Sequence, residues 1–171
     1  MLMVGMFAWL LGRRALWLVP MTFVGVMAVG GMLGIAGIGV PSVEIGIALS
    51  VVVLGAIVAF NVKAPVAVAM GVVGLFAIFH GHTHGAEIPE DAGGVAYAAG
   101  FLFATAILHL TGISAGFLTG KAGQRHGSVV VRLAGSLTTA AGAALLVGIS
   151  DFPRAMLGFS FGQPFDKLHF A

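Results

Sequence analysis

The sequence contains no cysteine, and only 8% of its 171 residues are charged. The absence of cysteine excludes disulfide bonds and thiolate metal sites. Soluble domains carry about 25% charged residues, so this chain lacks the surface that such a domain needs. The basic residues are scattered between apolar runs and form no basic face, which excludes a nucleic-acid partner. The sequence also has no P-loop, nucleophile elbow or HExxH motif, and we expect no enzyme.

Long apolar runs fill most of the chain, and 59% of all residues are hydrophobic. Five runs are long enough, or nearly so, to cross about 30 Å of hydrocarbon at about 1.5 Å per residue. We predict membrane-spanning helices at residues 16–38, 43–60, 64–79, 94–118 and 129–149. The predicted fold class is therefore all-α, a polytopic transmembrane helix bundle in a lipid bilayer. Glycines at small-residue spacing, at 30–34 and 112–120, are expected to serve helix packing.

The two ends of the chain differ from these spans. Residues 1–11 are apolar but too short to cross a bilayer, and they lack the charged start and cleavage site of a signal peptide. We interpret them as the second half of a truncated first helix, preceding five full helices. The bundle is expected to occupy residues 1–150. Residues 151–171 interleave phenylalanine with proline, glycine and charge, and predict an interfacial or loosely ordered aromatic-rich tail.

Basic residues occupy alternate connections between the predicted spans. They lie at residues 13–14, at 63 and at 121–132, whereas the other connections carry no charge at 40–42 and three acidic residues at 85–91. The positive-inside rule then predicts that the basic connections are cytoplasmic and that the acidic 85–91 loop is outside.

Three of the six histidines cluster at the end of the third predicted span, in the run Phe-His-Gly-His-Thr-His-Gly-Ala-Glu at residues 79–87. If the helix continues, His80, His84 and Glu87 share one face, and His82 points roughly the other way. Two imidazoles and a carboxylate suit Ni, Zn, Cu or Fe. The alternative is that imidazole merely tolerates the membrane interface, but three histidines in register with a glutamate favour metal binding. The glycines at 81 and 85 predict either unwound backbone that lines a cavity or a helix stop.

Two further ionisable residues are candidates. Glu44 begins the span 43–60 at the same level as the histidines, either as a helix N-terminal charge or as a fourth ligand. His109 lies deep in the span 94–118, and its depth predicts a position toward the cytoplasmic side, too far from His80 to share one ion. It is either a second station for the metal or a histidine hydrogen-bonded within the bundle.

Residues 79–87 resemble the hallmark of the HupE/UreJ family, bacterial membrane proteins associated with hydrogenase and urease assembly. The resemblance extends to residues 14–20, 43–50 and 97–112. It implies six transmembrane helices in the bacterial inner membrane and a nickel permease role, with cobalt in some relatives. It also implies His80, His84 and Glu87 as metal residues of the fourth family helix, and hydrogenase or urease maturation proteins as partners. Ni²⁺ would be the transported ion, with no tightly bound cofactor.

The resemblance departs from the family pattern at the start of the chain. Family members carry a His-Pro…Asp-His motif at the outer end of their first helix, and this sequence begins just downstream of that position, at Met1. We therefore expect a truncated or mis-started reading frame.

Our leading hypothesis is transmembrane transport of a divalent transition metal, most simply Ni²⁺, from an outward-facing site. The alternative is a membrane metal-binding accessory protein that hands over metal without translocating it. A membrane-embedded metal hydrolase is a weaker third hypothesis, because Glu90 and Asp91 are the only spare acids near the histidines.

Overall fold

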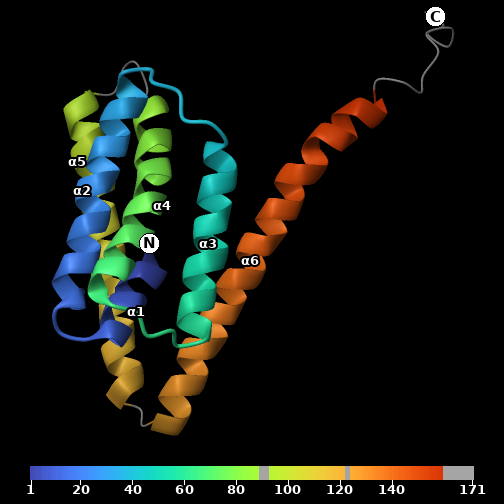
Figure 1. Ribbon diagram of the computed structural model, residues 1–171. Helices are drawn as coiled ribbons and strands as arrows, with labels where there is room; N and C mark the ends of the chain where they lie inside the picture. Colours follow the sequence, from blue (N-terminus) through green and yellow to red (C-terminus); the bar gives the residue numbers. More distant parts are fainter. Residues whose placement is uncertain (89–92, 122–123, 160–171) are drawn as a thin grey trace, which may run out of the picture.

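The computed structural model describes residues 1–88, 93–121 and 124–159, and every regular element in these ranges is an α-helix. The helices are α1 (Leu2–Leu11), α2 (Ala15–Ile35), α3 (Val43–Ala59), α4 (Val66–Ala86), α5 (Gly94–Lys121) and α6 (Gln124–Phe159), shown in Figure 1. By length and composition α2, α4, α5 and residues 126–149 of α6 can each cross a membrane, and α1 and α3 are shorter apolar helices. The predicted all-α membrane bundle is confirmed.

The helices differ from the predicted spans mainly at their ends. Helix α4 runs through Gly81 and Gly85 to Ala86, so it continues through the histidines as predicted, and neither glycine unwinds or stops it. Helix α6 extends past residue 149 to Phe159. The expected start of the tail at residue 151 therefore falls inside a helix, and residues 160–171 of that tail lie outside the described residues.

Helices α2 and α4 touch backbone to backbone at glycines. A Cβ atom on Gly81 would overlap the carbonyl oxygen of Met27, and one on Gly85 would overlap that of Gly31. In the other direction, a Cβ on Gly34 would overlap the carbonyl oxygen of His82. Such close approach is the usual basis of helix association in lipid, where apolar side chains gain little by leaving the hydrocarbon. The predicted packing role of the glycines at 30–34 is confirmed.

Two more helix pairs are joined in the same way. Between α1 and α5, a Cβ on Gly5 would overlap the carbonyl oxygen of His109, and one on Gly112 that of Leu2. Between α3 and α6, a Cβ on Gly55 would lie 2.7 Å from the backbone nitrogen of Thr139. The six helices are therefore arranged as three tightly joined pairs.

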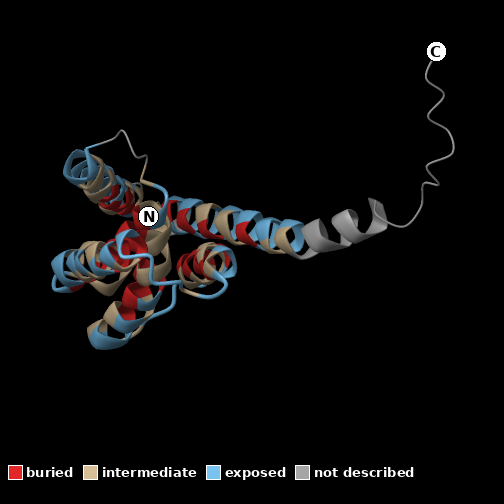
Figure 2. Ribbon diagram, turned by 90° about the horizontal axis from the view of Figure 1, so that it is seen from above, coloured by how far each residue is buried: buried red, intermediate tan, exposed pale blue. Residues whose placement is uncertain are grey.

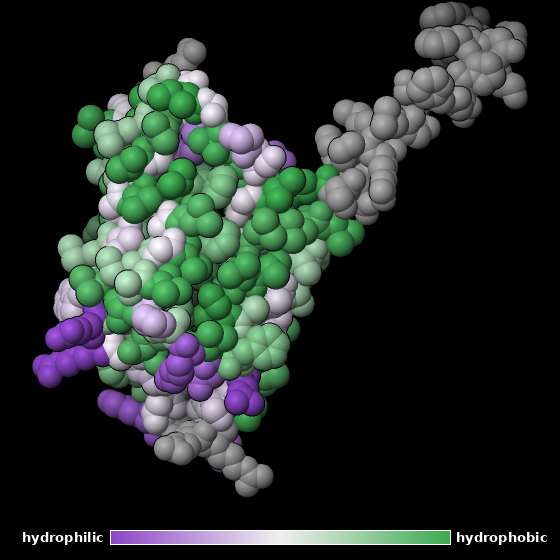
Figure 3. Space-filling model, viewed as in Figure 1, coloured by the Kyte–Doolittle hydropathy of each residue, from purple (hydrophilic) through white to green (hydrophobic). Residues whose placement is uncertain are grey.

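The surface of the bundle is apolar around its middle, and its basic connections lie at one end. Buried residues lie on the helix sides that face one another, as the view from above shows (Figure 2). Large hydrophobic side chains are exposed on the outside, among them Trp17 at 71% and Phe60 at 78%, as expected where lipid is the solvent. Hydrophilic residues gather at the end where the α1–α2, α3–α4 and α5–α6 connections lie (Figures 1 and 3).

We expect Gly81→Ala to destabilise the bundle, because its new Cβ meets the backbone of α2, and overpacking costs about 1–3 kcal/mol. The matched control is Gly71→Ala on the same helix, where a Cβ meets nothing within 4 Å and better helix propensity adds up to about 1 kcal/mol. Thermal unfolding of the purified variants in detergent measures the difference. Equal stability of the two variants would contradict the close contact between α2 and α4.

Candidate metal-binding site

His80 lies on the side of α4 that faces α2. Its half-buried ring packs edge-on against the ring of Phe23, with centroids 5.7 Å apart. Its Nδ1 is 3.0 Å from the carbonyl oxygen of Phe76. Because a carbonyl oxygen only accepts, Nδ1 carries the proton, and Nε2 keeps the lone pair that a metal ion needs. A backbone hydrogen bond that fixes the tautomer in this way is typical of histidine ligands.

His84 lies one turn further along α4 and faces α5. Its ring stacks on that of Phe101, with centroids 4.9 Å apart and an interplanar angle of 11°. Tyr97 packs edge-on against the same phenyl ring, at 5.9 Å. His80 and His84 therefore point from α4 toward two different helices, α2 and α5.

His82 points to a different neighbour. Its Nε2 is 2.9 Å from the carbonyl oxygen of Ile38, so this nitrogen donates a hydrogen bond to the connection between α2 and α3. The bond ties the end of α4 to that connection. The predicted divergence of His82 from His80 and His84 agrees with these contacts.

The two glutamates of the predicted site are exposed. Glu87 follows the last residue of α4, and its backbone N–H donates to the carbonyl oxygen of Thr83 at 3.0 Å. Glu44 lies in the first turn of α3, where the helix dipole favours a carboxylate. A Cβ on Gly46 would lie 2.6 Å from the ring of Phe79, so the start of α3 is level with the start of the histidine run, as predicted.

Helix packing alone does not gather these side chains into a closed site. Within residues 1–88, 93–121 and 124–159, no three His, Asp or Glu side chains lie close enough together to hold one ion. The structure thus brings His80, His82, His84, Glu87 and Glu44 to one end of the bundle and turns them toward different partners.

His109 is the most deeply buried ionisable side chain among the described residues, with 2% of its surface exposed. Neither of its ring nitrogens has a hydrogen-bond partner within the described part of the chain, which differs from the alternative of a hydrogen-bonded histidine. Buried polar groups are normally paired, and an unpaired one in a membrane helix is a candidate for function. This imidazole thus has one N–H donor and one nitrogen lone pair that a ligand could engage.

Phe23 separates His109 from His80. The His109 ring meets the Phe23 ring edge-on, with centroids 5.1 Å apart and an interplanar angle of 86°. The two histidines thus contact one phenyl ring from different sides. That they lie too far apart to share one ion stays a prediction. His109 lies near the middle of α5, which has 28 residues.

Sequence reasoning missed Phe23 and the surroundings of His109. Phe23 and Met27 on α2 face Thr105 and His109 on α5, and the Thr105 hydroxyl lies 3.8 Å from the Met27 sulfur. A groove of about 610 Å³ between α2 and α5 reaches His109, and its other lining residues are apolar or aromatic. The spacing of four residues within each pair was visible in the sequence, but it does not say which helices face one another.

The fold and its histidine-bearing interior define a multi-pass α-helical membrane protein. A family model described as HupE / UreJ protein matches residues 1–145, and the chain belongs to this family of hydrogenase and urease accessory proteins. It is 55% identical over 149 residues to Protein HupE of Rhizobium leguminosarum bv. viciae, which covers 86% of this chain and 76% of that protein. The resemblance found in the sequence is confirmed. No solved structure matches the chain.

His109, which has no hydrogen-bond partner among the described residues, and His82, which has one, should contribute differently to stability in metal-free buffer. We expect His109→Leu to leave the free energy of unfolding unchanged or to raise it, because an unsatisfied buried polar group costs about 1–3 kcal/mol. We expect His82→Leu to lower it by about 1 kcal/mol, through loss of the hydrogen bond to Ile38. Thermal unfolding in detergent with a chelator measures both. A larger loss in His109→Leu would mean that His109 has a partner in the metal-free protein.

Proposed function

We propose that this chain transports a divalent transition metal, Ni²⁺ in the first instance, across the bilayer for hydrogenase or urease maturation. The observation that carries the proposal is the buried, unpartnered imidazole of His109 beside the ring that also packs against His80. Membership of the HupE/UreJ family supports the link to hydrogenase and urease. Imidazole nitrogens are ligands for Ni²⁺, and no competing thiolate is present.

The proposed route has an outer and an inner station. Ni²⁺ loses water to the free Nε2 of His80 and to His84, assisted by the exposed carboxylates of Glu87 and Glu44. It then reaches His109 past the Phe23 ring, which fills the space between the two imidazoles. His82 donates to Ile38 and contributes by holding the end of α4. A few imidazoles and carboxylates bind firmly enough to dehydrate the ion and weakly enough to release it.

The membrane potential is the proposed driving force. The sequence has no nucleotide-binding motif. A potential of 100 mV, negative inside, favours inward movement by about 2.3 kcal/mol per elementary charge, and a divalent cation gains about twice that.

We further propose that the chain lies in the bacterial inner membrane with its basic connections in the cytoplasm and the 85–91 loop outside. The support is the segregation of the charges. Arg13, Arg14 and Lys63 lie in the connections at one end, and Glu44 and Glu87 border the connections at the other.

The absence of native cysteine gives a direct test of this orientation. We expect a cysteine at Ser42→Cys, in the α2–α3 connection, to react with a membrane-impermeant maleimide added to intact spheroplasts. A cysteine at Val62→Cys, in the α3–α4 connection, should react only after lysis. Both positions are exposed, so access to solvent does not distinguish them. Labelling in the reverse order would invert the proposed topology.

The test of transport is Ni²⁺ accumulation in cells that express the chain. We expect the double variant His80→Ala, His84→Ala to lose uptake, since it removes both imidazoles of the outer station. The matched control is His126→Ala, which removes an exposed histidine near the start of α6, at the opposite end of the bundle. Equal membrane abundance of all three proteins is verified by immunoblot.

Each other outcome has a defined meaning. Ni²⁺ binding to the purified parent without uptake would replace transport by the accessory hypothesis, in which the protein hands over metal. Metal-dependent hydrolysis of a substrate by the purified protein, without Ni²⁺ flux into cells, would favour the membrane metal hydrolase. Equal uptake by the parent and the double variant would remove His80 and His84 from the route.

A further inference from the structure

The end of the bundle that carries the basic connections has no carboxylate of its own. The described residues at this end are 12–14, 60–65, 119–121 and 124–132, and they contain six Lys or Arg residues and neither Asp nor Glu. The six acidic residues of the chain all lie elsewhere in the sequence. Within the part of the chain that the structure describes, no carboxylate lies at this end to neutralise its positive charge.

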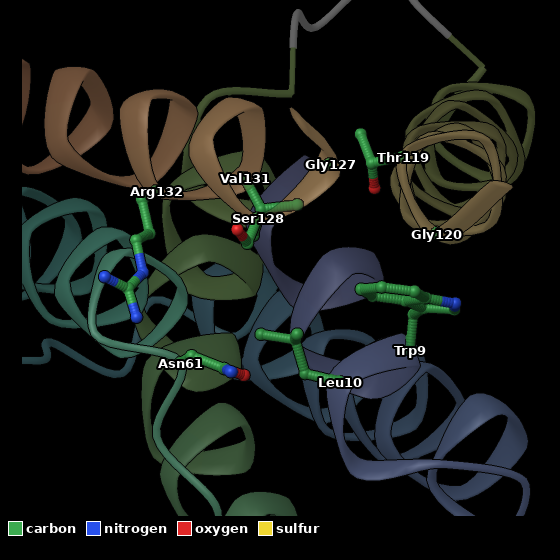
Figure 4. Close-up of a pocket in the computed structure, with 9 residues that line it drawn as sticks. All are labelled: Trp9, Leu10, Asn61, Thr119, Gly120, Gly127, Ser128, Val131 and Arg132. Atoms are coloured by element: carbon green, nitrogen blue, oxygen red, sulfur yellow. The ribbon is translucent and has the colours of Figure 1, made fainter. Parts of the chain in front are cut away.

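A pocket at this end contains one of the six cations. It has a volume of about 300 Å³ and lies between α1, α5, α6 and the turn after α3 (Figure 4). That volume is at the lower end of the range for small-molecule sites, about 300–1,000 Å³. The polar side chains in its wall come from four different elements. They belong to Trp9, Asn61, Thr119, Ser128 and Arg132.

Arg132 is available for a ligand. Lys63, in the same part of the molecule, already donates to the carbonyl oxygen of Leu10 at 2.7 Å. No hydrogen bond or ion pair engages the Arg132 side chain within the described residues, and that side chain is exposed. A guanidinium presents five N–H donors in a planar fork that matches the oxygens of a phosphate.

The other walls fit the head-group region of a bilayer. The Asn61 amide and the ring of Trp9 also line the pocket. Tryptophan prefers the level of the lipid head groups, where its ring is apolar and its N–H is solvated. Next to the pocket, Leu118 on α5 and Leu133 on α6 are exposed at 67% and 58%, which offers apolar surface to acyl chains.

We propose that this pocket binds the phosphate of an anionic phospholipid, with Arg132 as its principal ligand and Trp9 beside the head group. The exposed leucines favour a lipid over a free anion, because a free phosphate gains nothing from apolar surface. Basic pockets between transmembrane helices are a known setting for anionic head groups. The site is separate from the histidines and goes beyond metal transport.

The test uses the fluorescence of Trp9. Trp17, the other tryptophan of the chain, is exposed on α2 and is replaced in a Trp17→Phe background. The full-length protein in detergent is titrated with brominated phosphatidylglycerol or brominated phosphatidylcholine, whose bromine quenches a nearby indole. We expect half-maximal quenching at a lower mole fraction of the anionic lipid.

Two substitutions separate the pocket from general surface charge. We expect Arg132→Gln to raise the half-saturating fraction of phosphatidylglycerol about fivefold, the factor that corresponds to about 1 kcal/mol per basic residue at a membrane surface. Arg13→Gln removes the same charge at the same end but does not line the pocket, and should change that fraction less than twofold. Arg132→Lys keeps the charge but loses the planar guanidinium, so its half-saturating fraction should lie between those of the other two variants. This variant also shows that the position tolerates substitution.

Three results would overturn the proposal. Equal quenching by the two lipids would show no preference for anionic head groups. Equal effects of Arg132→Gln and Arg13→Gln would reduce the preference to surface charge. If millimolar inorganic phosphate abolished the quenching of Trp9 by brominated phosphatidylglycerol, the pocket would be assigned to a free anion. No metal is present in the assay, so its outcome is independent of Ni²⁺ transport.

Discussion

Where two helices of this bundle approach most closely, a glycine of one meets a main-chain atom of the other. In a bilayer this contact decides which helices pair, because leucine and valine side chains gain little free energy by leaving the lipid tails for another helix. The positions of the glycines therefore fix both the partner of each helix and its rotation about its own axis. The direction of every other side chain follows from that rotation.

The histidine run shows how this works. Gly81 and Gly85 are pressed against α2, at Met27 and Gly31, and so define the contact face of α4. His80 and His84 directly precede these glycines, so they lie on one flank of the contact face. His82 directly follows Gly81 and lies on the other flank. The contacts agree with this arrangement. His80 packs against Phe23 and His84 against Phe101, whereas His82 donates to the carbonyl oxygen of Ile38. The alternation of histidine with glycine thus places the close helix contact and the imidazole side chains on different sides of the same short segment of α4.

The sequence predicted the helical class, the spans and the continuation of α4 through its histidines, because hydrophobicity and local helix geometry are encoded over short distances. It did not predict that Phe23 would lie between His80 and His109, nor that Arg132 and Trp9 would line one pocket. Those arrangements depend on how separate helices are rotated and shifted against one another.

The pairing of helices at their backbones also has a mechanical consequence. Main-chain atoms in direct contact cannot slide past one another without a clash, so sliding of α2 along α4, or of α1 along α5, is sterically opposed. The boundary between these two helix pairs includes Phe23 and Met27 on one side and Thr105 and His109 on the other. Side chains can change rotamer, and a boundary built from them is therefore the compliant part of the molecule. A shift of one helix pair against the other would therefore be taken up at this boundary, where the phenyl ring of Phe23 lies.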